Sequence, residues 1–212
     1  MAKIQYEKMV SPAGIAVWPH LNSPDTKFDK GDGTGEYKVD VKLDEATAQP
    51  VIARLQKILD QYYGEEVSQN PKVKQFNQHL PISEEVDDQG NLTGSWILRV
   101  KQKARIQTNN GPVDMKVALF DAKRRPTNAK IGGGSTLKVS VTIVPYTMPS
   151  NKAVGISLRL NAVQVINLVE GGKDGDSSMF SEEEGFTDET SEVASTFAKP
   201  DGDTIDYGDT DF

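Results

Sequence analysis

The sequence predicts a mainly β fold with one helix, and three observations support this prediction. Segments of alternating apolar and polar residues, bounded by turn-forming residues, recur along the first 170 residues. One segment between residues 44 and 64 has helical spacing instead, and the periodicity stops after Glu170. The expected strands include long ones, and the last of them slips in phase between Asn161 and Gln164. Long, bent strands suit a small coiled barrel better than a flat sheet, so we expect an OB-like Greek-key barrel of five or slightly more strands.

The expected strands are separated by residues that favour turns. They cover residues 14–18, 36–43, 96–107, 113–120, 137–145 and 153–169. The segment 36–43 (EYKVDVKL) alternates strictly, which predicts a strand with one buried face. We expect turns at Asn110-Gly111, at Arg125-Pro126 and at the glycine triplet 132–134.

A single helix is expected after the second of these strands. Asp44 can cap this helix, and apolar residues at helical spacing continue to Gly64. Pro50 is tolerated only in the first turn of a helix, so we expect the helix to begin nearer Gln49 than Asp44. Residues 64–94 are polar and show no sustained periodicity, and we interpret them as a long insertion or loop.

Charge divides the chain into two expected regions. Residues 1–170 contain 22 Lys and Arg against 18 Asp and Glu, whereas residues 171–212 contain 2 against 13. The net charge of −7 therefore combines +4 in the first region with −11 in the second. Between residues 96 and 138, ten basic residues accompany only two acidic ones. We expect one OB-like domain over 1–170 and a disordered acidic tail over 171–212, because the tail has too few apolar residues to offset its ordering entropy.

The composition excludes several classes of protein. The chain has no cysteine, which removes disulfides, thiolate chemistry and Cys-based zinc sites. No apolar run approaches the roughly 20 residues of a membrane span, and the N-terminus has no secretory signal, so we expect a soluble protein of the cytoplasm. His20 and His79 are isolated, the glycine triplet 132–134 lacks the rest of a phosphate-binding loop, and no catalytic triad order is found. We therefore expect no enzymatic activity, no cofactor and no metal.

The most informative stretch is the segment 97–108 (ILRVKQKARIQT). Strand alternation predicts one face that carries Arg99, Lys101, Lys103 and Arg105. Alternate residues of a strand lie about 6.6 Å apart, close to the roughly 6 to 7 Å repeat of phosphates in an extended single strand. This spacing favours contact with the backbone of single-stranded DNA, although a stripe standing alone is also typical of a solvated strand face.

Further candidate residues lie on strands and turns that a barrel would bring near this stripe. The basic ones are Lys38, Lys42, Arg124, Arg125, Lys130, Lys138, Lys152 and Arg159. Unpaired bases also stack on aromatic rings, for which the candidates are Trp18, Tyr37, Trp96 and Tyr146. Tyr37 and Trp96 are in phase with core aliphatic residues, which is equally typical of a barrel core. Tyr146 closes a strand at the expected rim and is the preferred stacking residue.

The chain ends in DGDTIDYGDTDF, a series of acidic residues that finishes in an aromatic one. Because this segment imitates a polyanion with stacking groups, we expect it to compete with DNA for the basic residues. DNA that displaces it would make it available to partner proteins. The expected partner-binding residues are Asp209, Asp211 and Phe212. A purely solubilising tail is the alternative.

Three blocks of sequence carry a resemblance to a known family. They are GEYKVDVKL (35–43), IGGGSTLKVSVTIVPY (131–146) and NKAVGISLRLNAVQVINLVE (151–170). In order and spacing they resemble segments of the single-stranded DNA-binding protein family of short-tailed lytic phages, and the ending Asp211-Phe212 is similar to that of the family's tails. The segment 64–94 matches poorly, so no family contact is carried over there.

The resemblance implies an OB-fold protein that coats single-stranded DNA, promotes annealing and serves phage DNA replication, recombination and repair. It also implies recruitment of the phage DNA polymerase and helicase-primase through the terminal aromatic, here Phe212. Family members dimerise, which makes a homodimer or higher oligomer an open expectation for this chain. The expected location is the cytoplasm of the infected bacterium. The residue pattern leaves three alternative functions open: an RNA-binding or strand-annealing module, a metal-dependent nuclease, and a DNA-mimicking inhibitor.

Overall fold

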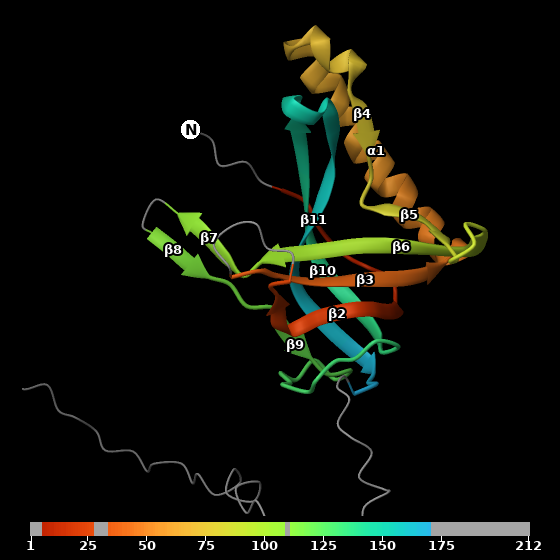
Figure 1. The fold of residues 1–212 in the computed structure, drawn as a ribbon, viewed down its shortest axis with the longest axis vertical. Coiled ribbons are helices and arrows are strands. Elements are labelled where there is room, and N and C mark those ends of the chain that lie inside the picture. Colours follow the sequence, from red (N-terminus) through yellow and green to blue (C-terminus); the bar gives the residue numbers. More distant parts are fainter. Residues whose placement is uncertain (1–5, 28–33, 109–110, 171–212) are drawn as a thin grey trace, which may run out of the picture. The chain divides into compact units, whose positions relative to one another are not determined.

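A closed barrel forms the centre of the computed structural model, which describes residues 6–27, 34–108 and 111–170. Its strands are β2 (Gly14–Asp25), β3 (Glu36–Asp44), β6 (Leu92–Lys103), β10 (Thr136–Met148) and β11 (Ala153–Asn167). They pair in the order β2-β3-β6-β11-β10, and β10 returns to β2 to close the barrel (Figure 1). The β6–β11 pair is parallel and the other four pairs are antiparallel. This five-stranded Greek-key order is that of the OB fold, which confirms the predicted fold class.

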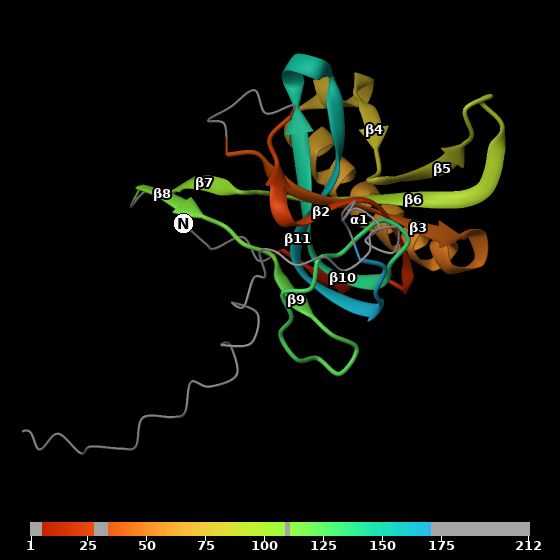
Figure 2. The same ribbon diagram turned by 60° about the horizontal axis from the view of Figure 1, so that its bottom comes forward.

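Shorter strands extend the barrel at its edges. β1 (Lys8–Val10) pairs with β10, and β5 (Ile82–Val86) pairs with β6. β4 (Asn77–His79) and β9 (Ala118–Phe120) run parallel to β11. β7 (Arg105–Thr108) and β8 (Gly111–Asp114) form a separate two-stranded ribbon that projects away from the barrel in every view (Figures 1 and 2). Two 3-10 helices, η1 (Pro71–Gln75) and η2 (Pro149–Asn151), complete the described elements.

The core follows from the alternation of the barrel strands. On β3 and β6, the residues facing inward are buried and, apart from Gln102, apolar, whereas most of their neighbours face outward. Val41 and Leu98 are opposite each other across this pair and are both fully buried. Each such side chain contributes about 1.5 to 3 kcal/mol through removal of apolar surface from water. The strict alternation in the sequence therefore separates a core face from a solvent face, and the solvent face is the one that carries charge.

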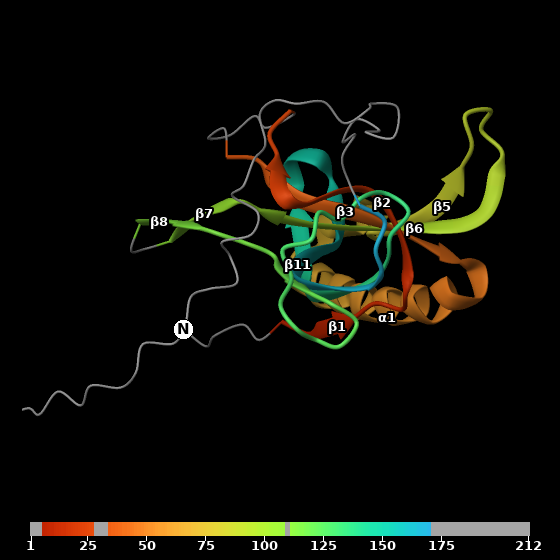
Figure 3. The same ribbon diagram turned by 90° about the horizontal axis from the view of Figure 1, so that it is seen from below.

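Helix α1 (Glu45–Gln69) begins earlier and ends later than predicted. The side chain of Asp44 caps it by accepting a 2.8 Å hydrogen bond from the backbone N–H of Thr47. Pro50 lies in the second turn on the exposed side of the helix, so the prediction of a start near Gln49 is wrong. Gly64 is likewise exposed and does not end the helix. Figure 3 shows α1 beside β1 on one side of the barrel, where Arg54 forms a 3.2 Å ion pair with Glu7.

The segment 64–94 is not a long loop, and that prediction is wrong. It contains the last turns of α1, the helix η1, the strands β4 and β5, and the start of β6. The sequence pattern does not reveal β4 and β5, because these strands are short and most of their side chains are exposed or partly exposed. They therefore show no apolar alternation. They form only because β11 and β6 supply partners to pair with.

The phase slip predicted near the end of the chain is confirmed as a β-bulge in β11. Ser140 pairs with Ala162 but Val141 pairs with Leu160, which leaves Asn161 as the additional residue. Its side-chain amide donates a 3.0 Å hydrogen bond to the hydroxyl of Thr142. The bulge bends the long β10–β11 hairpin so that it can take part in the barrel.

Candidate nucleic-acid interface

A row of basic side chains crosses the outer face of the barrel from strand to strand. Lys38 on β3 is opposite Lys101 on β6, and Lys101 is in turn opposite Arg159 on β11. On the other side, His20 on β2 is opposite Lys38. We call these four residues the basic row. Because neighbouring strands lie about 4.8 Å apart, the row extends over roughly 14 Å.

The basic row leads into a groove of about 450 Å³ between β6, the β7–β8 ribbon and the β10–β11 hairpin. The residues that line it are Glu36, Lys101, Gln102, Lys103, Ile106, Gln107, Met115, Val144, Ser157 and Arg159. Three of them are cationic and one is a carboxylate, so the groove has an excess of positive charge. Its remaining lining combines apolar side chains with amides and a hydroxyl. This combination fits a ligand that has a charged backbone and flat, weakly polar groups.

The ion pairs of this face are of the kind that a competing anion can replace. Lys101 lies 3.2 Å from Glu36, with both side chains partly exposed, and Lys38 lies 2.6 Å from the more buried Asp25. An exposed pair such as Lys101–Glu36 contributes only about 0 to 1 kcal/mol. Within the described part of the chain, Lys103 and Arg159 form no ion pair at all. The groove therefore offers cations that are available to phosphate groups.

Two carboxyl groups on this face have shifted pKa values. A hydrogen bond from Lys38 is the main cause that lowers the pKa of Asp25 below its ordinary value. Asp40 is opposite Arg99 on β6, and its partial burial raises the pKa of its carboxyl group, while Arg99 and Lys38 oppose the rise. Asp40 thus places a poorly solvated negative charge among the cations.

The predicted stripe of four cations on one strand is divided by the structure. Arg99, Lys101 and Lys103 share the outer face of β6, but the strand ends there. The backbone of Ala104 bonds to Gly35 and Met115, which turns the chain out of the barrel. Arg105 therefore lies on the ribbon, where its Nε donates a 2.6 Å hydrogen bond to Asp114. The prediction of one strand over 96–107 is wrong because apolar alternation continues through the break, and the strand expected over 113–120 likewise splits into β8 and β9.

The other predicted cations lie in three separate places. Lys42 forms a 2.6 Å ion pair with Glu85 of β5, which directs it away from the groove. Lys152 ends η2 at the tip of the β10–β11 hairpin, in a left-handed conformation. Arg124 and Lys138 line a second hollow of about 280 Å³, together with apolar residues of β1, β9 and β11. None of these three sites lines the groove.

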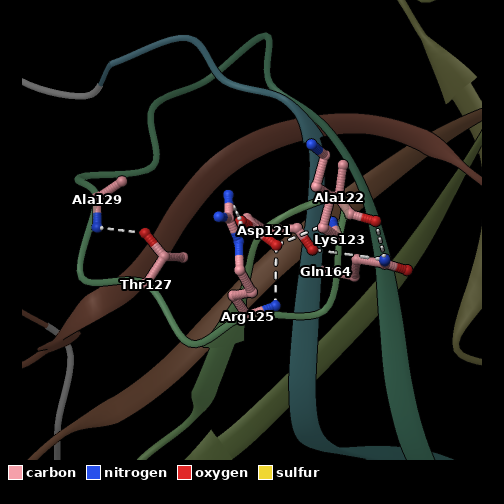
Figure 4. A network of polar contacts seen from close by, with 7 residues as sticks. All are labelled: Asp121, Ala122, Lys123, Arg125, Thr127, Ala129 and Gln164. Carbon is pink, nitrogen blue, oxygen red and sulfur yellow. Dashed lines mark hydrogen bonds and ion pairs between the residues drawn. The ribbon is translucent and has the colours of Figure 1, made fainter.

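Arg125 serves a structural role in the turn between β9 and β10. Its Nε donates a 2.7 Å hydrogen bond to the carboxylate of Asp121, whose other oxygen accepts from the backbone N–H groups of Lys123 and Arg125 (Figure 4). The backbone hydrogen bond from Arg125 is the largest cause that lowers the pKa of Asp121. The amide of Gln164 ties the same turn to β11 by donating a 3.0 Å hydrogen bond to Ala122 (Figure 4).

Three of the four predicted stacking residues, Tyr37, Trp96 and Tyr146, are buried or partly buried. Tyr37 is 8% exposed and belongs to the core, so no base reaches its ring in this structure. Trp96 is partly buried and packs against the core. The ring of Tyr146 lies over Gly155, its partner across the hairpin, with the hydroxyl 2.8 Å from where a Cβ on that glycine would be. The side chain is otherwise partly exposed, so Tyr146 stays a predicted stacking residue.

The exposed aromatic of this face is Trp18, whose side chain is 78% exposed. The sequence marks it only as one candidate among several. The apolar groove residues Ile106, Met115 and Val144 were not predicted, and no sequence signal could have found them, because only closure of the barrel brings them together. The predicted partner-binding residues Asp209, Asp211 and Phe212 lie outside the described residues.

The barrel order and the basic outer face define an OB-fold protein with the charge distribution of a nucleic-acid interface. A family model described as "Single-stranded DNA-binding protein, Bacteriophage T7" matches residues 14–168. The chain belongs to this family, as its sequence blocks indicated. The family consists of binding proteins rather than enzymes, which confirms the prediction of a non-enzymatic protein.

Individual relatives agree with this assignment. The chain is 24% identical to the single-stranded DNA-binding protein of Enterobacteria phage T3 over 201 residues, covering 86% of this chain and 87% of the relative. The crystal structure of gp2.5, the single-stranded DNA-binding protein of bacteriophage T7, is similar at a TM-score of 0.64, with 24% identity and coverage of 86% and 99%. The single-stranded DNA-binding protein of bacteriophage Enc34 in complex with ssDNA is similar at 0.50, with 17% identity and coverage of 77% and 88%.

Two features are absent from the described ranges. No helix there has the length and hydropathy needed to cross a membrane. No group of three or more histidine or carboxylate side chains in these ranges is close enough to hold a metal ion.

Proposed function

We propose that this chain binds and coats single-stranded DNA without strong sequence preference during phage DNA replication and recombination, in the cytoplasm of the infected bacterium. The observation that carries this proposal is the basic row that leads into the groove. Lys38, Lys101 and Arg159 come from three different strands and form one line only because β6 pairs with β3 on one side and with β11 on the other. The membership of the family and the ssDNA complex of the Enc34 protein support the same function.

The geometry favours contact with the backbone over reading of sequence. The phosphates of an extended single strand repeat every 6 to 7 Å or so, and the roughly 14 Å row therefore matches about two nucleotides. Lys101, Lys103 and Arg159 would neutralise phosphates in the groove, while Ile106 and Met115 offer apolar surface to bases. Phosphate contacts fix position but carry no sequence information. Because the proposed contacts are mainly to phosphates, we expect the protein to coat single-stranded DNA without strong sequence preference.

The proposal includes a regulatory role for the acidic tail. Residues 171–212 carry a net charge of −11, and the groove they would compete for has an excess of cations. A tethered polyanion binds with a high effective concentration, so it lowers the apparent affinity for DNA until DNA displaces it. Once displaced, Asp209, Asp211 and the terminal Phe212 recruit the phage DNA polymerase and helicase-primase.

Titration of a fluorescent oligo-dT across salt concentrations tests both parts of this proposal. The full chain should bind with a log–log salt slope of roughly −3, because the four Lys and Arg residues of the basic row and the groove together would neutralise about four phosphates at roughly 0.7 each. A chain ending at Glu170 should bind several-fold more tightly at low salt. Fluorescence anisotropy measures both values, and an RNA oligonucleotide of the same length serves as competitor. Absence of binding by either protein would overturn the DNA-binding proposal, and equal affinities would overturn the role of the tail.

Replacement of Asp40 by asparagine is expected to increase the affinity for oligo-dT about 2- to 5-fold at pH 7, since it removes a negative charge from the basic face. The same change has a pH-dependent effect on stability. Because burial raises the pKa of Asp40 in the folded state, the wild-type carboxyl destabilises the fold above this pKa. The variant should be more stable than the wild type at pH 7, and this difference should disappear as the pH falls through the pKa of Asp40. Urea denaturation of both proteins at pH 7 and at a pH below that pKa measures the effect.

Asp60→Asn is the matched control for this variant. Asp60 lies on the exposed side of α1 and accepts a hydrogen bond only from the helix's own Gln56 among the described residues. It should leave the affinity within about twofold of the wild type. An Asp40→Asn variant that binds no more tightly than Asp60→Asn contradicts the placement of DNA on this face.

A further inference from the structure

Another hollow, distinct from the one lined by Arg124 and Lys138, lies at the end of the basic row that is opposite the groove. Its volume is about 410 Å³, and it is formed by residues 18–23 of β2 and residues 130–133 of the loop before β10. His20 belongs both to its lining and to the basic row, whereas Lys101 and Arg159 line the groove at the other end. Gly132 and Gly133 of the glycine triplet, which do not line the groove, form part of the wall of this hollow.

Trp18 enters this hollow through a β-bulge. Val17 pairs with Asp40 and His20 pairs with Lys38, so Trp18 and Pro19 together are opposite a single residue of β3. Trp18 has φ of 48°, a left-handed conformation that is costly for a residue with a Cβ. The bulge turns an indole that would otherwise face the core out into solvent, where it is 78% exposed. Strain and apolar exposure at one residue indicate a binding role.

The walls of the hollow are fixed by hydrogen bonds between distant segments. The side chain of Asn22 donates a 2.8 Å hydrogen bond to Ala129 and accepts a 3.0 Å one from the backbone of Ile131. The backbone N–H of Gly134 donates to Ala16 at 2.9 Å. Lys130 adds an exposed cation that forms no ion pair with any residue of the described ranges. The hollow thus offers a rigid pocket with an aromatic face and a cation.

We propose that this hollow is a nucleobase-binding subsite for the same single strand that occupies the groove, with one base stacked on Trp18 and Lys130 beside a phosphate. This inference rests on the proposed function and extends it. A strand that follows the basic row reaches the hollow about two nucleotides from the groove. Stacking on an indole accepts any base, which agrees with binding that is independent of sequence.

Substitution of Trp18 tests the subsite. Trp18→Asn removes the ring and is chosen because asparagine adopts the left-handed conformation more readily than other residues. It should weaken oligo-dT binding roughly 5- to 100-fold, whereas Trp18→Phe should stay within about threefold of the wild type. Leu92→Ala on β6 removes another exposed apolar side chain, which lies outside both the groove and this hollow, and should have no effect.

A second variant acts on the opposite wall without touching Trp18. A Cβ at Gly133 would meet only the backbone oxygen of Ala16, at 3.9 Å, so Gly133→Leu fits the fold but places a side chain in the open space beside the hollow. It should weaken binding in the same range as Trp18→Asn. This variant keeps the test decisive if Trp18→Asn does not fold, as judged by circular dichroism.

Intrinsic fluorescence supplies an independent readout. The chain contains two tryptophans, so Trp96→Phe leaves Trp18 as the sole indole emitter. Oligo-dT should quench this emission. Affinities of Trp18→Asn and Gly133→Leu within twofold of the wild type, together with unquenched emission, would overturn the subsite. If such variants bind normally while reversal of Lys101 and Arg159 abolishes binding, the subsite fails and the proposed function stands; if the wild type does not bind, both fail.

Discussion

Simultaneous replacement of Lys101 and Arg159 by glutamate should reduce the affinity for oligo-dT by at least about 100-fold at moderate salt. The two residues are opposite each other across the parallel β6–β11 pair and both line the groove. Each charge-assisted hydrogen bond to a phosphate is worth about 1.5 to 3 kcal/mol, so loss of two gives at least this factor before repulsion is added. The log–log salt slope should also become shallower by roughly 1.4, for two fewer neutralised phosphates.

The control for this variant has the same change in net charge at another surface. Lys57 and Lys72 lie on α1 and η1, outside both the groove and the basic row. Their joint replacement by glutamate should reduce affinity only a few-fold, through the general field of the protein. Anisotropy titration of both double variants with oligo-dT separates the two effects. Equal losses would show that net charge, rather than the groove, governs binding.

Replacement of Leu98 by alanine is expected to lower the free energy of unfolding by about 2 to 5 kcal/mol. Leu98 is fully buried on β6, where it is opposite both Val41 of β3 and Ile82 of β5. The lost free energy has two parts: less apolar surface is removed from water on folding, and a cavity remains because the closed barrel relaxes only partly into the vacated space. Urea denaturation should show a lower midpoint with an unchanged slope.

Leu92→Ala is the internal control, because it makes the same chemical change on the same strand. Leu92 is 62% exposed, and its replacement should alter the stability by no more than about 0.5 kcal/mol. Similar midpoints for the two variants would contradict the assignment of the inner face of β6. Since the groove cations lie on the opposite face of this strand, Leu98→Ala should bind DNA normally wherever it remains folded.

The barrel could be predicted from the sequence because its strands carry their pattern locally. On β3 and β10, burial alternates almost without interruption, and this alternation is visible in the residue types themselves. The bulge at Asn161 was predictable for the same reason, as it shifts the phase of the apolar residues. Strands without such a pattern were not predictable. β4 and β5 exist because a neighbour supplies hydrogen bonds, and this information lies elsewhere in the chain.

The candidate site shows the same division between local and distant information. Alternation on one strand correctly places Arg99, Lys101 and Lys103 on a common face. It does not reveal that Ala104 ends the strand, because hydrogen bonds to Gly35 and Met115 cause that break. Phase alone also does not distinguish a core aromatic from a surface one. Tyr37 is in phase with the core and buried, whereas Trp18 is exposed only because the bulge changes its direction.

Because Lys101 and Arg159 meet only across the parallel β6–β11 pair, the proposed DNA-binding surface depends on completed folding. β11 is the last described strand, and it must return past β10 to reach β6 before the basic row is continuous. Contacts of such large sequence separation form late in the folding of β proteins. A chain that is still being synthesised, or one that has lost β11, therefore lacks a continuous basic row. On the proposed function, only fully folded molecules would bind DNA through this row, and the bound DNA would in turn stabilise them against unfolding by mass action.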